Sequence, residues 1–197
     1  MVSTALFVVI VTMGITVILN VNKSHKVSAN VRDMMDNINF VMEDMSRNIR
    51  IASDLHCDDS TPANSIPVQS SSLEDQSSCI SSGVAGAQAS EWIAFEGLTG
   101  TSGDPNDQIV YQIISPQSGS FSVLRKSRDG GASFSQITTD GVHLDAAKSG
   151  FTVYGAKSGD AIQPRAIIRL AGTIAYGATI IPFDVQTSIA TRNRESF

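Results

Sequence analysis

Two cysteines and three histidines carry the most reactive side chains of this chain. Cys57 and Cys79 are the complete set of thiols, so they can form at most one pair. If this part of the chain lies outside the cytoplasm, a disulfide between them is the expected state. It would close a loop of about 23 residues and stabilise the fold by roughly 3 kcal/mol. Two unpaired, buried thiols are the alternative.

The histidines do not belong to any recognisable nucleophile motif. They stand apart in the sequence, at His25, His56 and His143. His56 is next to Cys57, but neighbouring residues rarely face each other productively enough to make a thiolate–imidazole pair. No Cys-x-x-Cys spacing occurs, so a metal site is not expected. The sequence therefore predicts no catalytic, cofactor-binding or metal-ligating residue.

Three short segments contain acidic residues that could bind a ligand or a metal ion. The adjacent acids Glu43 and Asp44 are interpreted as part of a solvated helix face. The segment 103–107, Gly-Asp-Pro-Asn-Asp, offers oxygen ligands for calcium but lacks the spaced acids of an EF-hand, so an ordinary Asp- and Asn-rich turn is favoured. The segment 127–134 matches the Asp-box hairpin of sialidase-like propellers, where the motif recurs in each blade. A single copy predicts only a tight β-turn.

The overall composition argues against nucleic acid as a partner. The chain has 197 residues and a formal charge of −5. Its basic residues are scattered, so no nucleic-acid surface is evident. The length suits one domain together with an anchor.

An apolar segment at the N-terminus would anchor the rest of the chain. No charged residue precedes Lys23, and residues 5–19 are rich in Leu, Ile, Val and Phe. As a helix, residues 1–22 would span about 33 Å, enough to cross the hydrocarbon core of a bilayer. Insertion would be favoured by roughly 3 to 6 kcal/mol. We expect contacts with lipid and with neighbouring helices from Phe7, Val8, Val11, Ile15, Ile18 and Leu19.

A cleaved secretory signal peptide is the alternative interpretation of this segment. The small residues at 27–29 would suit a signal peptidase. However, no Lys or Arg precedes the apolar run, and Lys23 and Lys26 lie in the supposed cleavage region. The helical pattern also continues through Ala29 without a break. These observations favour an uncleaved helix.

Beyond residue 22, apolar residues recur at intervals of three and four, which is typical of one face of a helix. No Pro or Gly interrupts residues 15–53. We predict one helix of roughly 75 Å from about residue 2 to Ser53, with an apolar half over 1–22 and an amphipathic half over 23–53. A free-standing coiled coil is the alternative for the second half, although a Met-rich stripe would make a weak one. The residues expected to be buried under a globular head are Val31, Met34, Ile38, Val41, Met45 and Ile49.

The remainder of the chain is predicted to be loop and strand. Residues 54–90 are Ser-rich and form a predicted loop region that the cysteine pair would staple. From Glu91 the apolar period changes to two, so residues 91–197 are predicted to form a β-rich globular head. The expected fold class is α+β, a long N-terminal α-helix packed on a C-terminal antiparallel β-sheet. The candidate strands are 92–95, 108–114, 121–126, 133–137, 142–145, 151–154, 165–170 and 179–189.

Several segments resemble the type IV pilin and pseudopilin family. Residues 1–7, Met-Val-Ser-Thr-Ala-Leu-Phe, lead into an apolar run that resembles the inner part of the family's N-terminal helix, just past its Glu. Residues 38–50 are similar to the second half of that helix in minor pseudopilins (PulJ/PilW-like). Residues 163–170 and 183–192 resemble the last strands of related minor pilin-like proteins.

The leader and the N-terminal Glu that mark this family are missing from the chain. The family's leader is basic and ends in Gly, followed by an aromatic residue and, four positions later, the Glu. We expect that the start was assigned at an internal Met, or that the chain is trimmed. A prepilin peptidase is an expected partner only if the missing leader exists.

The resemblance implies a pilin-like fold and a non-enzymatic structural subunit, a minor pilin or pseudopilin of a type IV pilus or type II secretion-like filament. Such subunits rest in the cytoplasmic membrane as single-pass proteins with the head extracytoplasmic. They then pack their helices against other pilin or pseudopilin subunits in a cell-surface or periplasmic filament. No cofactor is implied. The alternatives are a membrane-anchored extracytoplasmic ligand- or glycan-binding domain and, third, an anchored hydrolase.

Overall fold

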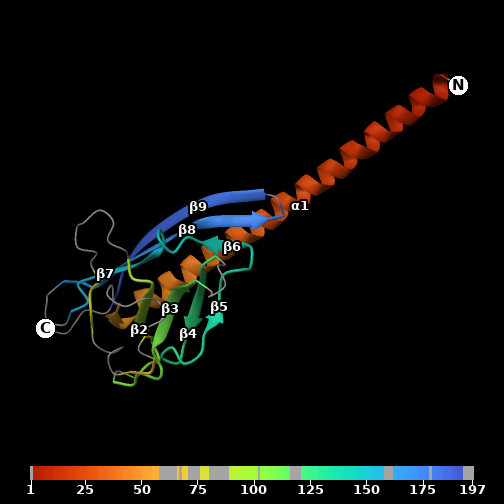
Figure 1. Ribbon diagram of the computed structural model, residues 1–197. Helices are drawn as coiled ribbons and strands as arrows, with labels where there is room; N and C mark the ends of the chain where they lie inside the picture. Colours follow the sequence, from red (N-terminus) through yellow and green to blue (C-terminus); the bar gives the residue numbers. More distant parts are fainter. Residues whose placement is uncertain are drawn as a thin grey trace.

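One long helix and a β-rich head make up the fold. The computed structural model describes residues 2–57, 66, 68–70, 76–79, 89–101, 103–115, 121–157, 162–177 and 179–192 of the chain. Helix α1 runs from Val2 to Arg50, and its first half projects away from the head (Figure 1). Most of the predicted loop over 54–90 lies outside the described residues.

The end of α1 comes earlier than the apolar pattern predicts, at Arg50 rather than about Ser53. The N–H of Ile51 donates to the carbonyl oxygen of Asn48 at 3.3 Å, a tighter spacing than that of an α-helix, which closes the last turn. The carbonyl oxygen of Arg50 accepts a hydrogen bond from the N–H of Arg192 at 2.7 Å. The helix terminus is therefore fixed by a residue that follows β9.

The head consists of two antiparallel sheets, so the predicted α+β class is confirmed, although a single sheet was expected. The first sheet has the strand order β1-β2-β3-β4-β5, and in the second β8 pairs with β6, β7 and β9. The strands are β1 (Ser53–His56), β2 (Trp92–Glu96), β3 (Ile109–Ile114), β4 (Val123–Ser127), β5 (Ser135–Gln136), β6 (Val142–Leu144), β7 (Gly150–Tyr154), β8 (Arg165–Tyr176) and β9 (Thr179–Ala190).

Strand β8 organises the second sheet. It pairs along its whole length with β9, while its other edge pairs first with β7 and then with β6. A Cβ added to Gly172 would lie 2.1 Å from the carbonyl oxygen of His143, so the close approach of β6 requires a glycine there. Isolated bridges from Ser90 to Phe151 and from Ser122 to Leu144 join the two sheets.

Two strands differ from the sequence prediction for local reasons. Strand β1 lies almost entirely in the segment predicted as loop. It has only four residues, and Asp54 among them has a positive φ of 51°, so its sequence shows no alternating strand pattern. Strand β8 continues to Tyr176, beyond the predicted end at Leu170. Gly172 lies in this continuation and is the residue that admits β6.

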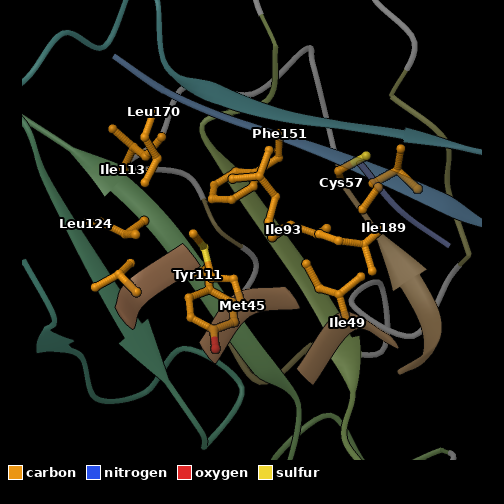
Figure 2. Close-up of a cluster of buried hydrophobic side chains, with 14 of the residues drawn as sticks. Met45, Ile49, Cys57, Ile93, Tyr111, Ile113, Leu124, Phe151, Leu170 and Ile189 are labelled. Carbon is orange, nitrogen blue, oxygen red and sulfur yellow. The ribbon is translucent and has the colours of Figure 1, made fainter. Parts of the chain in front are cut away.

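The core lies where the second half of α1 is covered by both sheets. Strands β8 and β9 lie on one side of the helix and β2 to β5 on the other (Figure 1). Figure 2 shows Met45 and Ile49 of the helix between Tyr111 and Ile93 of the first sheet and Ile189 of β9. The helix therefore forms the central layer of the core, between the two sheets, and does not simply lie on the outside of the head.

Candidate functional site

The apolar first half of α1 is the most unusual surface of the molecule. It is long and apolar enough to cross a membrane, and none of its most apolar stretch is buried in the head. The six residues predicted to contact lipid or neighbouring helices are exposed by 40% to 67%, and they are Phe7, Val8, Val11, Ile15, Ile18 and Leu19. A water-exposed apolar surface of this size marks a membrane or protein contact.

Two threonine hydroxyls inside this apolar half are satisfied by the helix itself. The hydroxyl of Thr12 donates to the carbonyl oxygens of Val8 and Val9, both at 2.9 Å, and the hydroxyl of Thr16 donates to that of Thr12 at 2.8 Å. Unpaired polar groups are costly in hydrocarbon, so internal hydrogen bonds of this kind suit a lipid environment. The segment is therefore compatible with a single-pass membrane anchor in both its length and its polar chemistry.

The amphipathic half of α1 meets the head through the predicted stripe. Four of its residues are buried, namely Ile38, Val41, Met45 and Ile49, and Val31 and Met34 are partly buried against the same cluster. The methyl group of Met34 reaches the position next to Gly141, where a Cβ would lie 2.3 Å away. The stripe therefore contacts the head from Val31 to the end of the helix.

A polar anchor, formed by Asp44, Asn48, Tyr111 and Lys126, fixes the rotation of the helix against β3 and β4. One carboxylate oxygen of Asp44 accepts hydrogen bonds from the Tyr111 hydroxyl at 2.6 Å and from the Lys126 ammonium at 2.7 Å. The side-chain amide of Asn48 donates to the Tyr111 oxygen at 2.9 Å. Asp44 was predicted to lie on a solvated face with Glu43, and that prediction is wrong for Asp44.

Burial and hydrogen bonding shift the pKa values of Asp44 and Tyr111 in opposite directions. Desolvation would raise the pKa of Asp44, but the hydrogen bonds from Lys126 and Tyr111 outweigh it, so the pKa is lowered. Burial, followed by the hydrogen bond to Asp44, raises the pKa of Tyr111. The Tyr111 hydroxyl therefore remains a neutral donor, and the Asp44 carboxylate remains ionised.

One feature of the sequence points to this anchor. Along β4, Leu124 and Lys126 are two residues apart and therefore point to the same, buried side of the strand. A lysine at an inward position requires an acidic partner. Only the fold shows that this partner is Asp44, which lies 82 residues away in the chain.

A second polar contact holds the amphipathic half of α1. The side chain of Asn37 donates from its Nδ2 to the carbonyl oxygen of Ile137 at 3.2 Å and accepts from the N–H of Thr139 at 3.1 Å. These two bonds tie the segment after β5 to the helix two turns before Asp44. Together with the anchor, they fix the register of the helix along the head.

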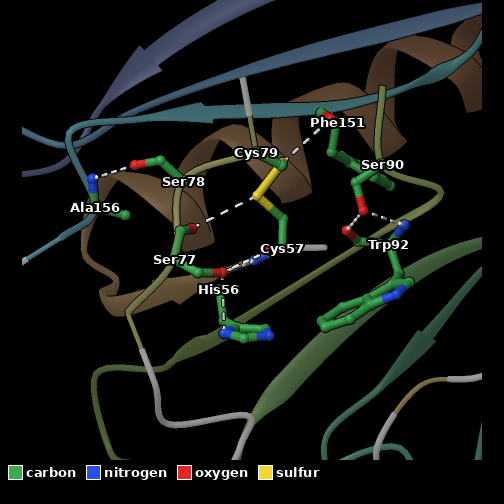
Figure 3. Close-up of a disulfide and its surroundings, with 9 residues drawn as sticks. All are labelled: His56, Cys57, Ser77, Ser78, Cys79, Ser90, Trp92, Phe151 and Ala156. Atoms are coloured by element: carbon green, nitrogen blue, oxygen red, sulfur yellow. Dashed lines mark hydrogen bonds between the residues drawn. A yellow bond between two sulfur atoms is a disulfide. The ribbon is translucent and has the colours of Figure 1, made fainter. Parts of the chain in front are cut away.

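The predicted disulfide is present and lies at the base of the helix. Cys57 and Cys79 are joined, with their Cα atoms 5.6 Å apart, and both residues are buried. The carbonyl oxygen of Cys79 accepts the N–H of Val153 in β7 at 3.3 Å. Figure 3 shows the bridge near Phe151 of β7, while the Trp92 ring lies beside that of His56. The disulfide therefore connects the strand that follows α1 to the second sheet.

A buried carboxyl lies at the end of β2. Glu96 accepts a hydrogen bond from the Gln108 amide at 2.9 Å through one oxygen, and its carboxyl group also lies beside that of Asp107. Burial, followed by the charges of Asp107 and Asp54, raises the pKa of Glu96 to about 7. This carboxyl therefore takes up a proton near neutral pH.

The remaining sequence candidates form turns and stacked rings. In the 127–134 segment, Asp129 accepts hydrogen bonds from Ser127 and Ser133, which lower its pKa to about 2 and close the predicted tight turn. In the 103–107 segment, Asp104 accepts the N–H of Asn106 at 3.0 Å in an Asx turn. His56 stacks on Trp92, and His143 stacks on Phe121. Within the described ranges, no group of three or more His, Cys, Asp and Glu side chains has the arrangement of a metal site.

Comparisons with known proteins returned no match to a family model, to a curated protein or to a solved structure.

Proposed function

We propose that this chain is a non-enzymatic structural subunit of the minor pilin or pseudopilin kind. In this proposal the apolar half of α1 anchors the chain in the cytoplasmic membrane with the head outside. The same surface then exchanges lipid for the helices of sister subunits in a type IV pilus or type II secretion-like filament. The exchange is inexpensive because lipid tails and apolar side chains are similar solvents for such a helix.

One observation supports this proposal most strongly. A single uninterrupted helix, Val2–Arg50, carries a fully exposed apolar half and then becomes the central layer of the head's core. The small residues at 27–29, which would suit a signal peptidase, lie inside this unbroken helix. A rigid continuation from anchor to head is what a subunit needs if its membrane segment is to be packed at a fixed position relative to its head.

Site-directed cross-linking in the native bacterium tests this function. Val11→Cys places a thiol on the exposed apolar half, and Leu98→Cys is a matched control on an exposed turn of the head. A thiol-reactive bifunctional reagent should join Val11→Cys to other pilin-like subunits carrying a cysteine on the equivalent helix. Cross-links should be absent when the filament-assembly ATPase is deleted, and Leu98→Cys should not form the same products.

The topology is tested in the same cells. A membrane-impermeant maleimide should label Leu98→Cys from the outside after the outer membrane is opened, and it should not label Val11→Cys. Labelling of Leu98→Cys only after the inner membrane is broken would contradict the proposed orientation. Cross-links that persist without the assembly ATPase would contradict the filament.

A further inference from the structure

An open hollow lies on the outer face of the second sheet, away from the helix. It has a volume of about 790 Å³ and is bounded by β6, the turn that follows it, β8 and β9. Register places His143, Thr173 and Pro182 in one row across these strands, with Asp184 in the next row. The volume falls within the range of small-molecule sites, and the walls come from well-paired strands.

A flat aromatic platform forms one side of the hollow. The rings of Phe121 and His143 stack in parallel, with centroids 3.8 Å apart and planes 3° apart. Phe121 is 60% exposed, so the ring is not buried by the fold. An exposed phenyl ring held rigidly by a stacked partner offers its negative face to polarised C–H groups.

Two ion pairs form the opposite side. Arg169 donates to both carboxylate oxygens of Asp184, at 3.1 and 2.7 Å, and Lys148 pairs with Asp145 at 2.9 Å. The N–H of Asp145 donates to the carbonyl oxygen of Ala171 at 2.8 Å, and Ala171 is the register partner of Asp184, so the two pairs lie near each other. The wall therefore presents fixed donors and acceptors side by side.

The aromatic ring and the two ion pairs together favour one class of ligand over others. Each cation of the wall is neutralised by a carboxylate within the same wall, so a phosphate group would gain little charge attraction. The hollow is open and half polar in its lining side chains, which disfavours an acyl chain. A sugar ring fits both sides, because one face carries C–H groups that stack on an aromatic ring and its edge carries neighbouring hydroxyl groups that bond to paired donors and acceptors.

We propose that the hollow between Phe121 and the Arg169–Asp184 pair is a saccharide-binding site of the head. The ring of Phe121 stacks on a pyranose, and Arg169, Asp184 and Lys148 bind its hydroxyl groups. This site goes beyond the proposed filament function and does not depend on it. A saccharide-binding head gives an anchored subunit a contact with glycan polymers outside the membrane.

Saturation-transfer NMR on the full chain tests this site. The protein is purified in lauryldimethylamine oxide, because glycosidic detergents would compete for the hollow. The probes are chitotetraose, cellotetraose and maltotetraose. Saturation should pass to the ring protons of at least one of them. Phe121→Ala and Arg169→Gln should each weaken that binding about tenfold, the loss expected of an aromatic contact or a charged hydrogen bond.

The matched control is Ile180→Ala. Ile180 is 67% exposed on the same face of β9 but does not line the hollow, so its replacement should leave the affinity unchanged. Emission from Trp92, the single tryptophan, reports whether each variant is folded. The site is overturned if no tetrasaccharide receives saturation, or if folded Phe121→Ala and Arg169→Gln both bind as tightly as the unmodified chain.

Discussion

Replacing Asp44 by alanine should lower the stability of the fold far more than removing an ordinary surface charge, because Asp44 belongs to the polar anchor. The substitution removes the acceptor of the Tyr111 hydroxyl and the counter-charge of Lys126. The Lys126 side chain is only 9% exposed, and the Asp44 side chain is 31% exposed. After the change, Lys126 keeps its position 5.1 Å from the centre of the Tyr111 ring. Its ammonium is then a nearly buried charge that has lost the acid with which it pairs among the described residues.

The magnitude follows from that burial. Removing one partner of a buried ion pair costs about 3 to 5 kcal/mol, and the partial exposure of Asp44 brings the expected loss here to about 2 to 4 kcal/mol. Glu43→Ala is the matched control, because Glu43 pairs with Arg47 at 2.9 Å and both side chains are more than two-thirds exposed. Such a surface pair contributes less than about 0.5 kcal/mol.

Urea unfolding of the full chain in detergent, followed by Trp92 emission, measures both losses. With a slope of about 2 kcal/mol per molar urea, Asp44→Ala should lower the midpoint by about 1 to 2 M. Adding Lys126→Met to Asp44→Ala should recover part of this loss, because an apolar side chain can occupy the buried site without a counter-charge. Equal midpoints for Asp44→Ala and Glu43→Ala would refute the assignment of the anchor.

Three further results are expected under the same assay. Ile38→Asp should unfold the head or release it from the helix, because the Ile38 side chain is 2% exposed and the new charge would be buried. The control Phe40→Asp, at a 70% exposed position, should change the midpoint little. Similar midpoints for the two variants would contradict the packing of the helix against the head. Reduction of Cys57–Cys79 should lower stability by roughly 3 kcal/mol, and an unchanged midpoint in reductant would argue against a stabilising bridge. The raised pKa of Glu96, about 7 against 4.5 unfolded, means that the folded chain binds the extra proton, so the contribution of this group to stability should be full below pH 4.5 and should be lost, by roughly 1 to 3 kcal/mol, as the pH rises from 4.5 to about 7. Glu96→Gln should flatten that slope, and an equal slope in both proteins would point to another group.

The helix could be predicted from sequence because its signals are local. A run of apolar residues without charge, followed by a three-and-four spacing, needs no tertiary information. The buried stripe of Ile38, Met45 and Ile49 has the same origin. The end of the helix at Arg50 could not be predicted, since it depends on a bond from Arg192 at the other end of the chain.

The division into two sheets was not predictable for a related reason. Strand periodicity gives the residues that alternate but not the strands that pair, and β8 has partners on both edges. The hollow beside Phe121 arises from that pairing, because His143 and Asp184 are brought together only through β8. The cysteine pair could be predicted because two thiols allow one bridge.

The position of α1 between two sheets has a mechanical consequence. A pull along the axis of the helix loads Asn37, the stripe and the Asp44 anchor at the same time, in shear, rather than peeling one contact after another. Forced unfolding is governed by the barrier to the first rupture, and a barrier shared among many contacts is high. The rod and the head should therefore bear tension as one piece, with the load transmitted through the middle of the domain.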